Sequence, residues 1–386
     1  MTTNARRSRT PIAFAVVAAL ALLVSIQPAI RYVRSAGLLL AVVGAEDPTR
    51  ITHLLRHQVA ARETALALPG RSLRARVYTP LDGSGQAAPR SWAIVLHGVH
   101  PDGIDERRLQ AFARALAATG VETFTPELKE LAEQRVLPST IDDIGACARA
   151  IEQQVKAKPA AIGISFAGGL LLLAAAREPG ASSIAYVVTV GAHHDLGRML
   201  RYYAGERVTD PDGKPAAGRA HPYGGRVMVT AYAELFFPPS DVPLAKRALA
   251  VWLKGKYREG RDLAAGLSAE GQDRFNVATQ SKRQSELNAL LLQAARAKSA
   301  ELHAVSPSSG LAGVRVPVFL VHGEGDPIVP ALETAWLARE VPKAVLRDAL
   351  ITPVLRHAEL AAPPTVRDQL DIVSFVAGFL AAADEP

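Results

Sequence analysis

Short apolar runs alternate with helical patterns from Trp92 onward, and this alternation constrains the fold more than any other feature of the chain. The runs WAIVLHG, VETFTPEL, AAIGIS and IAYVVTVG begin at residues 92, 121, 160 and 184, and helical stretches separate them. Nearly continuous apolar runs are typical of parallel strands buried on both faces. The alternation predicts an α/β fold, a doubly wound, mostly parallel sheet with helices on both faces.

The alternation stops near residue 192 and resumes at VPVFLVHG, which begins at Val316. The intervening residues form a loop-rich stretch and long helical patterns, so we predict a helical lid insertion over 192–312. It follows the carboxyl end of a strand, the edge of the sheet where ligands bind in such folds. The core then has two parts, 63–191 and 313–386. TALALPG and LRARVYTP predict a hairpin with Pro69 and Gly70 at its turn.

An apolar run near the N-terminus follows a basic tail. The tail, residues 1–10, holds three arginines, and residues 11–26 read PIAFAVVAALALLVSI. Extended to residue 30, the run has the roughly 20 residues that a transmembrane helix needs. We expect a transmembrane anchor or signal segment over 11–30 and a helical linker over 31–62. The basic flank predicts a membrane-anchored protein whose catalytic domain lies outside the cytoplasm. The alternative is a signal peptide cleaved after Ala45, which gives a secreted protein.

Charge and cysteine content exclude several classes of function. The net charge is +7, but five arginines precede the first acidic residue, Glu46, so the remaining chain is nearly balanced. Aromatic residues make up only 5% of the chain. Neither property favours nucleic-acid binding. Cys147 is the only cysteine, which excludes an internal disulfide, and its helical pattern predicts a buried structural residue.

Ser165 lies in Gly163-Ile164-Ser165-Phe166-Ala167, between a predicted strand and a predicted helix. A nucleophilic serine on a sharp strand-to-helix turn needs small residues two positions before and after it, because larger side chains collide with neighbouring elements. Gly163 and Ala167 meet this need, although glycine usually occupies the second position. The alternative is an ordinary serine in a turn.

Further chemical groups follow other predicted strands. LHGVHPDG places a His-Gly turn after the first core strand, so the backbone N–H groups of Val99 and Phe166 are candidates for an oxyanion hole. Asp326 follows the strand VPVFLVHG, and His357 lies in VLRHAEL before the last helix. The order serine, acid, histidine predicts the triad Ser165, Asp326 and His357.

These motifs resemble the α/β-hydrolase superfamily over residues 63–383, apart from the insertion. LHGVHPDG, GISFAGG, VHGEGDPIVP and RHAEL carry the resemblance, which is to esterase-like and dienelactone-hydrolase-like members with a helical lid. It implies Ser165 as nucleophile, Asp326 as acid and His357 as base. Ala167 departs from the usual glycine, and dienelactone hydrolases typically use a cysteine nucleophile, so the serine points to esterase chemistry.

Other polar residues receive structural interpretations. His193 and His194 are adjacent on an extended segment and point to opposite sides, which disfavours a shared metal ion, with or without His97 or His100. Asp195 is the fallback acid should Asp326 be misplaced. AHPYGG, residues 220–225, is interpreted as a polar turn, with lid lining as the alternative.

The leading hypothesis is a serine hydrolase that cleaves small-molecule carboxylic esters through an acyl-enzyme. It needs no cofactor and no metal, and its one expected macromolecular contact is the membrane, through the N-terminal segment. Alternatives are an acyltransferase or peptidase on the same triad, a non-catalytic binding module on the hydrolase fold, and an interaction platform whose main function lies in the membrane segment. The oligomeric state is left open.

Overall fold

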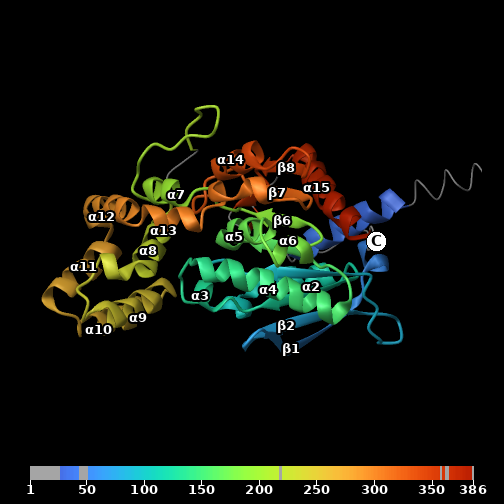
Figure 1. Ribbon diagram of the computed structural model, residues 1–386, viewed down its shortest axis with the longest axis horizontal. Coiled ribbons are helices and arrows are strands. Elements are labelled where there is room, and N and C mark those ends of the chain that lie inside the picture. The colour runs from blue at the N-terminus through green and yellow to red at the C-terminus, as the bar shows by residue number, and fades with distance from the viewer. Residues whose placement is uncertain (1–26, 43–50, 217–219, 357–358, 361–364, 385–386) are drawn as a thin grey trace, which may run out of the picture.

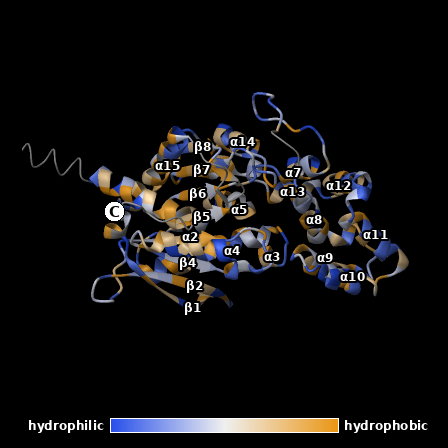
Figure 2. Ribbon diagram, turned by 180° about the vertical axis from the view of Figure 1, so that it is seen from behind, coloured by the Kyte–Doolittle hydropathy of each residue, from blue (hydrophilic) through white to orange (hydrophobic). Residues whose placement is uncertain are grey.

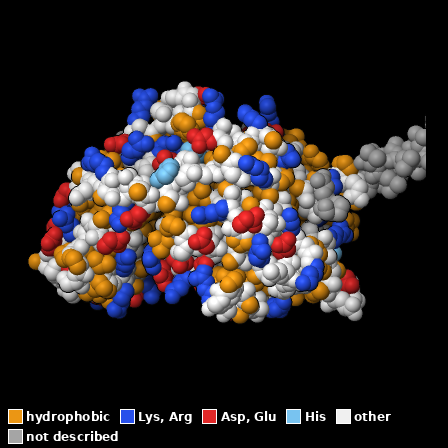
Figure 3. All heavy atoms as spheres, in the orientation of Figure 1, with side chains coloured by type: hydrophobic (Ala, Val, Ile, Leu, Met, Phe, Trp, Pro, Cys, Tyr) orange, Lys and Arg blue, Asp and Glu red, His pale blue; other side chains and the backbone are white. Residues whose placement is uncertain are grey.

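A central sheet with helices on both faces forms the body of the protein, and a set of helices extends from one edge (Figure 1). The computed structural model describes residues 27–42, 51–216, 220–356, 359–360 and 365–384. Hydrophobic residues gather on the strands and on the helix faces toward them (Figure 2). Positive and negative side chains are interspersed over the face that Figure 3 shows.

The sheet has eight strands in the order β1-β2-β4-β3-β5-β6-β7-β8. The strands β3 to β8 are parallel to one another, whereas β1 pairs antiparallel with β2, and β2 pairs antiparallel with β4. This confirms the predicted mostly parallel sheet. The strands are β1 Gln58–Leu68, β2 Arg71–Leu81, β3 Ser91–Leu96, β4 Val121–Pro126, β5 Ala160–Ile164, β6 Val187–Val190, β7 Val318–Gly323 and β8 Leu346–Thr352.

The predicted hairpin is confirmed, but the helical linker before it is shorter than expected. Leu68 pairs with Arg71 across the two-residue turn, where Gly70 has a φ of +74°. Residues 27–42 are helical and Ile51–Leu55 forms a single 3-10 turn, but residues from Gln58 onward form strand β1. The helix predicted across 58–62 is wrong because eleven consecutive backbone pairs with β2 outweigh the helix propensity of QVAAR.

Helices cover the two faces of the sheet and enclose two apolar cores. The buried apolar residues of α4, α5 and α14 belong to one core, and those of α15, helix 27–42 and most of α2 belong to the other. Ala113 and Ala117 of α2 instead pack with Tyr78 in a small separate cluster. Alternate residues of the strands serve the two cores; for example, Ala161 faces the first and Ile162 the second. The core helices are α2 Arg107–Ala117, α3 Lys129–Ala132, α4 Pro138–Val155, α5 Phe166–Ala175, α6 Gly180–Ser183, α14 Leu332–Glu340 and α15 Val366–Asp384.

Helix 27–42 packs against the domain beside the end of α15 (Figure 1). Arg34 is buried and donates to both carboxylate oxygens of Asp384 at 3.0 Å and to the carbonyl of Thr119 at 2.8 Å. Leu38, one turn further, is 2% exposed. Among the residues described, no helix is long and apolar enough to cross a membrane. Of the predicted anchor segment, 11–30, residues 11–26 lie outside the described part of the chain, and residues 27–30 begin helix 27–42.

The stretch 192–312 is helical, as predicted, and contains no strand among its described residues. A two-residue hairpin near the C-terminus, β9 Leu355–Arg356 and β10 Glu359–Leu360, was not predicted. The helices of the insertion are α7 Leu196–Tyr203, α8 Pro222–Ala231, α9 Val242–Leu253, α10 Tyr257–Ala264, α11 Ala269–Thr279, α12 Gln284–Ala297 and α13 Ser299–Ala304.

A buried ion pair ties the start of the insertion to the core. Glu333 on α14 is fully buried and accepts from Arg198 Nε on α7 at 2.6 Å and from the backbone N–H groups of His194 and Asp195. Its desolvated carboxylate is therefore matched by three donors. On the same helix, the carboxylate of Glu340, half-exposed, accepts from His194 Nε2 at 2.7 Å.

We expect Glu333→Ala to lower the free energy of unfolding by about 3 to 5 kcal/mol, because Arg198 is left as an uncompensated buried charge. Urea denaturation followed by circular dichroism measures this change. Glu340→Ala is the matched control, and its more exposed pair predicts a loss of about 1 kcal/mol or less. Equal losses in the two variants would contradict the role assigned to the buried pair.

Candidate active site

Ser165 occupies a sharp turn between β5 and α5. Its φ of +56° and ψ of −131° lie outside the regions that non-glycine residues normally adopt. The turn is held on both sides, because Ser165 N donates to the carbonyl of Val190 at 2.8 Å and its carbonyl accepts from Gly168 N at 2.9 Å. Backbone strain of this kind is concentrated at functional sites, so the conformation itself singles out Ser165.

Glycines make the turn possible by removing side chains from its tightest contact. A Cβ on Gly163 would lie 2.6 Å from the Cα of Gly168, and a Cβ on Gly168 would lie 2.8 Å from the Cβ of Ala192. Ala167, the small residue expected after the serine, is fully buried. The closest approach, however, is made by Gly168. This explains why the chain tolerates alanine at 167.

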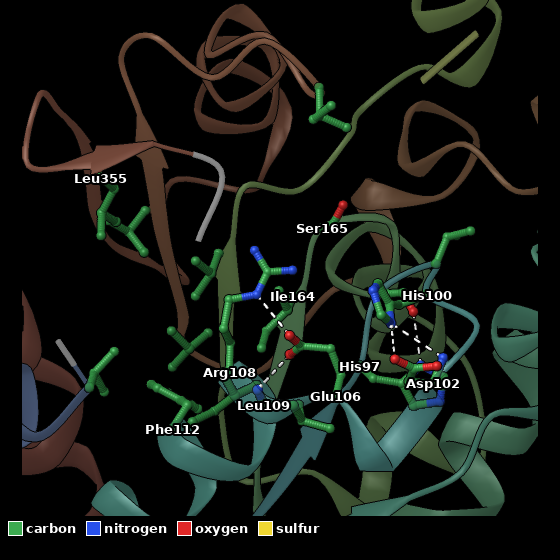
Figure 4. Close-up of a pocket in the computed structure, with 18 of the residues that line it drawn as sticks. His97, His100, Asp102, Glu106, Arg108, Leu109, Phe112, Ile164, Ser165 and Leu355 are labelled. Carbon is green, nitrogen blue, oxygen red and sulfur yellow. Dashed lines mark hydrogen bonds and ion pairs between the residues drawn. The ribbon is translucent and has the colours of Figure 1, made fainter. Parts of the chain in front are cut away.

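A cavity of about 1030 Å³ opens beside Ser165 (Figure 4). Ser165 is 8% exposed and lines the cavity together with residues of the sheet, α2, α15 and helix 27–42. The insertion also contributes, through Tyr223 on α8 and through Leu253, Lys254 and Lys256. The predicted position of the insertion at the ligand-binding edge thus agrees with the cavity that the structure contains.

The two predicted oxyanion donors flank the serine. Phe166 is the first residue of α5, so its N–H has no acceptor within the helix. The turn after β3 lies against Ser165, since a Cβ on Gly98 would lie 3.1 Å from the Ser165 Cβ and 3.2 Å from the carbonyl oxygen of Ile164. Val99 follows this contact and lines the cavity. Val99 therefore lines the same cavity as Ser165, and Phe166 is the next residue in the chain after Ser165.

His97 holds the turn after β3 in place. Its Nε2 accepts from the backbone N–H of Leu128 at 3.0 Å, so Nδ1 carries the proton and donates to the Gly98 carbonyl at 2.8 Å. Burial lowers the pKa of His97 to about 4, which keeps the ring neutral and both hydrogen bonds intact near pH 7. This role of His97 was not predicted from the sequence, where only metal binding was weighed for this residue.

Asp326 is buried just beyond the carboxyl end of β7. Its Oδ1 accepts from the backbone N–H groups of Ile328 and Val329 at 2.8 and 3.0 Å. The loop is clamped from the insertion, because Tyr203 Oη donates to the Ile328 carbonyl at 2.9 Å and His221 N donates to the Pro327 carbonyl at 2.7 Å. Ser165 and Asp326 thus follow the carboxyl ends of β5 and β7, two parallel strands separated by β6.

His357, the predicted base, lies outside the described residues. The structure describes the chain up to Arg356, the end of β9, and again at Glu359 and Leu360, which form β10. The described site therefore comprises Ser165 and the two candidate oxyanion donors after β5 and β3, with Asp326 after β7 on the far side of β6.

A polar cluster in the cavity was not predicted from the sequence. Glu106 caps α2 by accepting from Leu109 N at 2.8 Å, and it also accepts from Arg108 Nε at 2.8 Å (Figure 4). His100 and Asp102 line the wall on the other side of Ser165 in this view. Lys254 of the insertion donates to Asp102 at 3.1 Å. DERRLQ is an ordinary helix start in sequence, so nothing in it marked these charges as part of a cavity.

The histidines of GAHHDLG have structural partners. His193 Nε2 donates to the Val305 carbonyl at 3.0 Å, whereas His194 bonds with Glu340 and Arg198, so the two rings point to different partners. Asp195 caps α7 by accepting from Arg198 N. Across the described ranges, no group of three His, Cys, Asp or Glu side chains is arranged to hold a metal ion.

Two other sequence interpretations are now settled. Cys147 is buried, and burial raises the pKa of its thiol to about 12, as expected for a structural residue. The segment interpreted as a polar turn, AHPYGG, instead begins helix α8, with His221 as its N-cap and Tyr223 lining the cavity. The turn interpretation was wrong because Pro222 occupies the first helical turn, where a missing N–H costs nothing.

Comparison with known proteins agrees with the fold. The profile of the alpha/beta hydrolase fold family matches residues 94–349, about two-thirds of the chain. The chain belongs to the α/β-hydrolase family. No curated protein sequence matches it.

Similar solved structures include a puromycin-hydrolysing peptidase from Mycobacterium tuberculosis, with a TM-score of 0.50, 13% identity, and coverage of 85% of this chain and 40% of the peptidase. Dipeptidyl peptidase 4 from Porphyromonas gingivalis has a TM-score of 0.45, 12% identity, and coverage of 83% and 35%. The esterase domain of a Rhodothermus marinus protein has a TM-score of 0.42, 18% identity, and coverage of 84% and 97%. The chain spans less than half the length of the two peptidases. At these identities the likeness concerns the fold alone.

We expect Gly163→Ala to lower the free energy of unfolding by about 1 to 3 kcal/mol, because the new methyl group overlaps the backbone of Gly168. Chemical denaturation measures the change. Gly83→Ala is the control, since no atom lies within 4 Å of a Cβ at that position. A Gly163→Ala variant as stable as the Gly83→Ala variant would refute the tight contact.

Proposed function

We propose that the protein is a serine hydrolase that cleaves carboxylic esters, with Ser165 as its nucleophile. The observation that carries this proposal is the strained backbone of Ser165, at φ +56° and ψ −131°, beside a large cavity. A strained non-glycine residue has a cost of about 1 to 3 kcal/mol. A serine with only a structural role in a turn does not need such a conformation. A nucleophilic serine does, because the sharp turn exposes its hydroxyl group to the substrate.

The proposed reaction begins with attack by Ser165 Oγ on the ester carbonyl carbon. The oxygen–hydrogen bond of the serine breaks, and its proton passes to His357, which the resemblance assigns as base. The negative charge that develops on the carbonyl oxygen is stabilised by the N–H groups of Val99 and Phe166. Collapse of this intermediate expels the alcohol, which takes the proton from His357. Water then hydrolyses the acyl-enzyme by the same steps.

Asp326 is proposed to orient His357 and to stabilise its protonated form. Its burial and its two backbone donors support this role, because they fix the carboxylate in one position. The proposed serine chemistry needs neither a metal nor a cofactor. An acyltransferase or peptidase on the same residues remains the alternative, and so does a non-catalytic module.

We also retain the proposal that residues 11–30 anchor the protein to a membrane, with the catalytic domain outside the cytoplasm. The basic tail and the apolar run support it. Helix 27–42 includes the end of this segment and packs on the domain through Arg34 and Leu38. The proposal therefore implies a catalytic domain held close to the membrane surface.

We expect Ser165→Ala to abolish both labelling by a fluorophosphonate probe and hydrolysis of p-nitrophenyl acetate, with a fall in kcat/KM of at least about a thousandfold. Ser84→Ala, in the exposed loop after β2, is the control and retains both activities. Gel fluorescence and a continuous absorbance assay measure the two readouts. Persistent labelling of Ser165→Ala would show that another residue is the nucleophile.

A further inference from the structure

The cavity beside Ser165 has two chemically different regions. The polar side chains that line it, including Asp102, Glu106 and Lys254, come from the loop after β3, the start of α2 and the insertion. The remainder, here called the apolar arm, is lined by hydrophobic side chains of β5, β6, β7, α2, α15 and helix 27–42. Figure 4 shows Phe112 and Leu355 on the side of the cavity away from His100 and Asp102.

The apolar arm runs along one face of the sheet, away from the serine. Ile164 and Ile162 on β5 both line it, and they point to the same face because they are two residues apart. Between Ser165 and Ile162 the strand rises by roughly 10 Å. On the opposite wall, lining residues of α15 extend from Ile372 to Phe379, which at the helical rise is also roughly 10 Å. The wall formed by β5 and the wall formed by α15 therefore give the same depth for the apolar arm.

Helix 27–42 forms the wall at the deep part of the arm. Arg34 donates to the carbonyl of Thr119, two residues before β4 begins, and to Asp384 at the end of α15. The helix therefore packs at the amino ends of the parallel strands, whereas Ser165 lies at their carboxyl ends. Leu38, Leu39 and Val42 then follow within two turns, and all three line the cavity. This helix lies outside the part of the chain that matches the hydrolase profile.

We propose that the apolar arm binds the aliphatic acyl chain of the ester, and that helix 27–42 sets the longest chain that is accepted. This inference rests on the proposed function, because the ester carbonyl must lie at Ser165. Glu106 and Arg108 line the cavity between Ser165 and Phe112 (Figure 4). Beyond them the lining residues of the arm are hydrophobic, so the part of an occupant that reaches Phe112 and Phe375 is a chain without charges. The charged residues at the other region suit the alcohol portion, which leaves toward solvent.

The depth of the arm defines the expected chain length. Roughly 10 Å corresponds to about eight carbons, at the ~1.5 Å carbon–carbon bond shortened by the tetrahedral zigzag. Burial of each methylene contributes about a fourfold gain in binding. We therefore expect kcat/KM to rise steeply from acetyl through butyryl to octanoyl esters, and to level off or fall at palmitoyl.

A pair of isomeric esters tests which part of the substrate occupies the arm. Ethyl octanoate and octyl acetate have the same composition, but the long chain is on the acyl side in one and on the alcohol side in the other. We expect kcat/KM of the full-length wild-type protein to be at least tenfold higher for ethyl octanoate. A preference for octyl acetate, or equal rates, would overturn the proposal.

Variants on helix 27–42 test its role. Leu39→Trp fills the arm, so we expect kcat/KM for the octanoyl ester to fall at least tenfold and that for the acetyl ester to change less than twofold. Leu40→Trp is the matched control, because Leu40 is adjacent and does not line the cavity. Phe112→Ala provides an independent variant that widens the arm and shifts the optimum to longer chains. Unchanged chain-length profiles in both Leu39→Trp and Phe112→Ala would overturn the role of the arm.

The two proposals fail in different ways. Hydrolysis that Ser165→Ala abolishes but that does not depend on acyl length refutes the acyl arm and leaves the serine hydrolase in place. Absence of hydrolysis and of fluorophosphonate labelling for the wild-type protein refutes both.

Discussion

The close contact between Gly163 and Gly168 is the constraint on which the site depends. Strand β5 and helix α5 join through a single residue, and they can do so only because neither glycine carries a side chain at the point of contact. That junction forces Ser165 into its strained backbone conformation and leaves the Phe166 N–H at the free end of a helix. The positions of the proposed nucleophile and of one proposed oxyanion donor therefore follow from one packing contact.

Hydrogen bonds fix the two loops that accompany this junction in the candidate site. The β3 turn is fixed by the neutral ring of His97, and the Asp326 loop is fixed by bonds from Tyr203 and His221 of the insertion. The insertion is in turn tied to the core by the buried pair of Glu333 and Arg198. The insertion thus does more than cover the ligand-binding edge, because its first helices also determine where the candidate acid lies.

Much of the fold was predictable because strand burial leaves a strong signal. Continuous apolar runs as short as WAIVLHG favour a buried strand, and their alternation with helical patterns predicted the sheet and the place of the insertion. The start of β1 was not predictable, since QVAAR carries helix propensity and only its pairing with β2 makes it a strand. Ser165 and Asp326 could be proposed as site residues because each follows a predicted strand, whereas the role of Gly168 depends on a contact between two elements.

The walls of the cavity were the least predictable part of the site. Leu39 belongs to the apolar run AGLLLAVVGA, which was interpreted as part of a linker, and Tyr223 belongs to a stretch interpreted as a turn. Both contribute to the cavity only because distant segments of the chain meet at the sheet. No local sequence pattern indicates that distant segments contact each other. The residues that line the cavity are therefore harder to predict from the sequence than the candidate catalytic residues.

The central claim is that Ser165 forms a covalent acyl intermediate. The most direct test is peptide mass mapping of the wild-type protein after an acid quench during turnover of a p-nitrophenyl ester. The account predicts an added acyl mass on the peptide that contains Ser165. An acyl group found on a different residue, or an active enzyme in which rapid quenching traps no adduct, would contradict it.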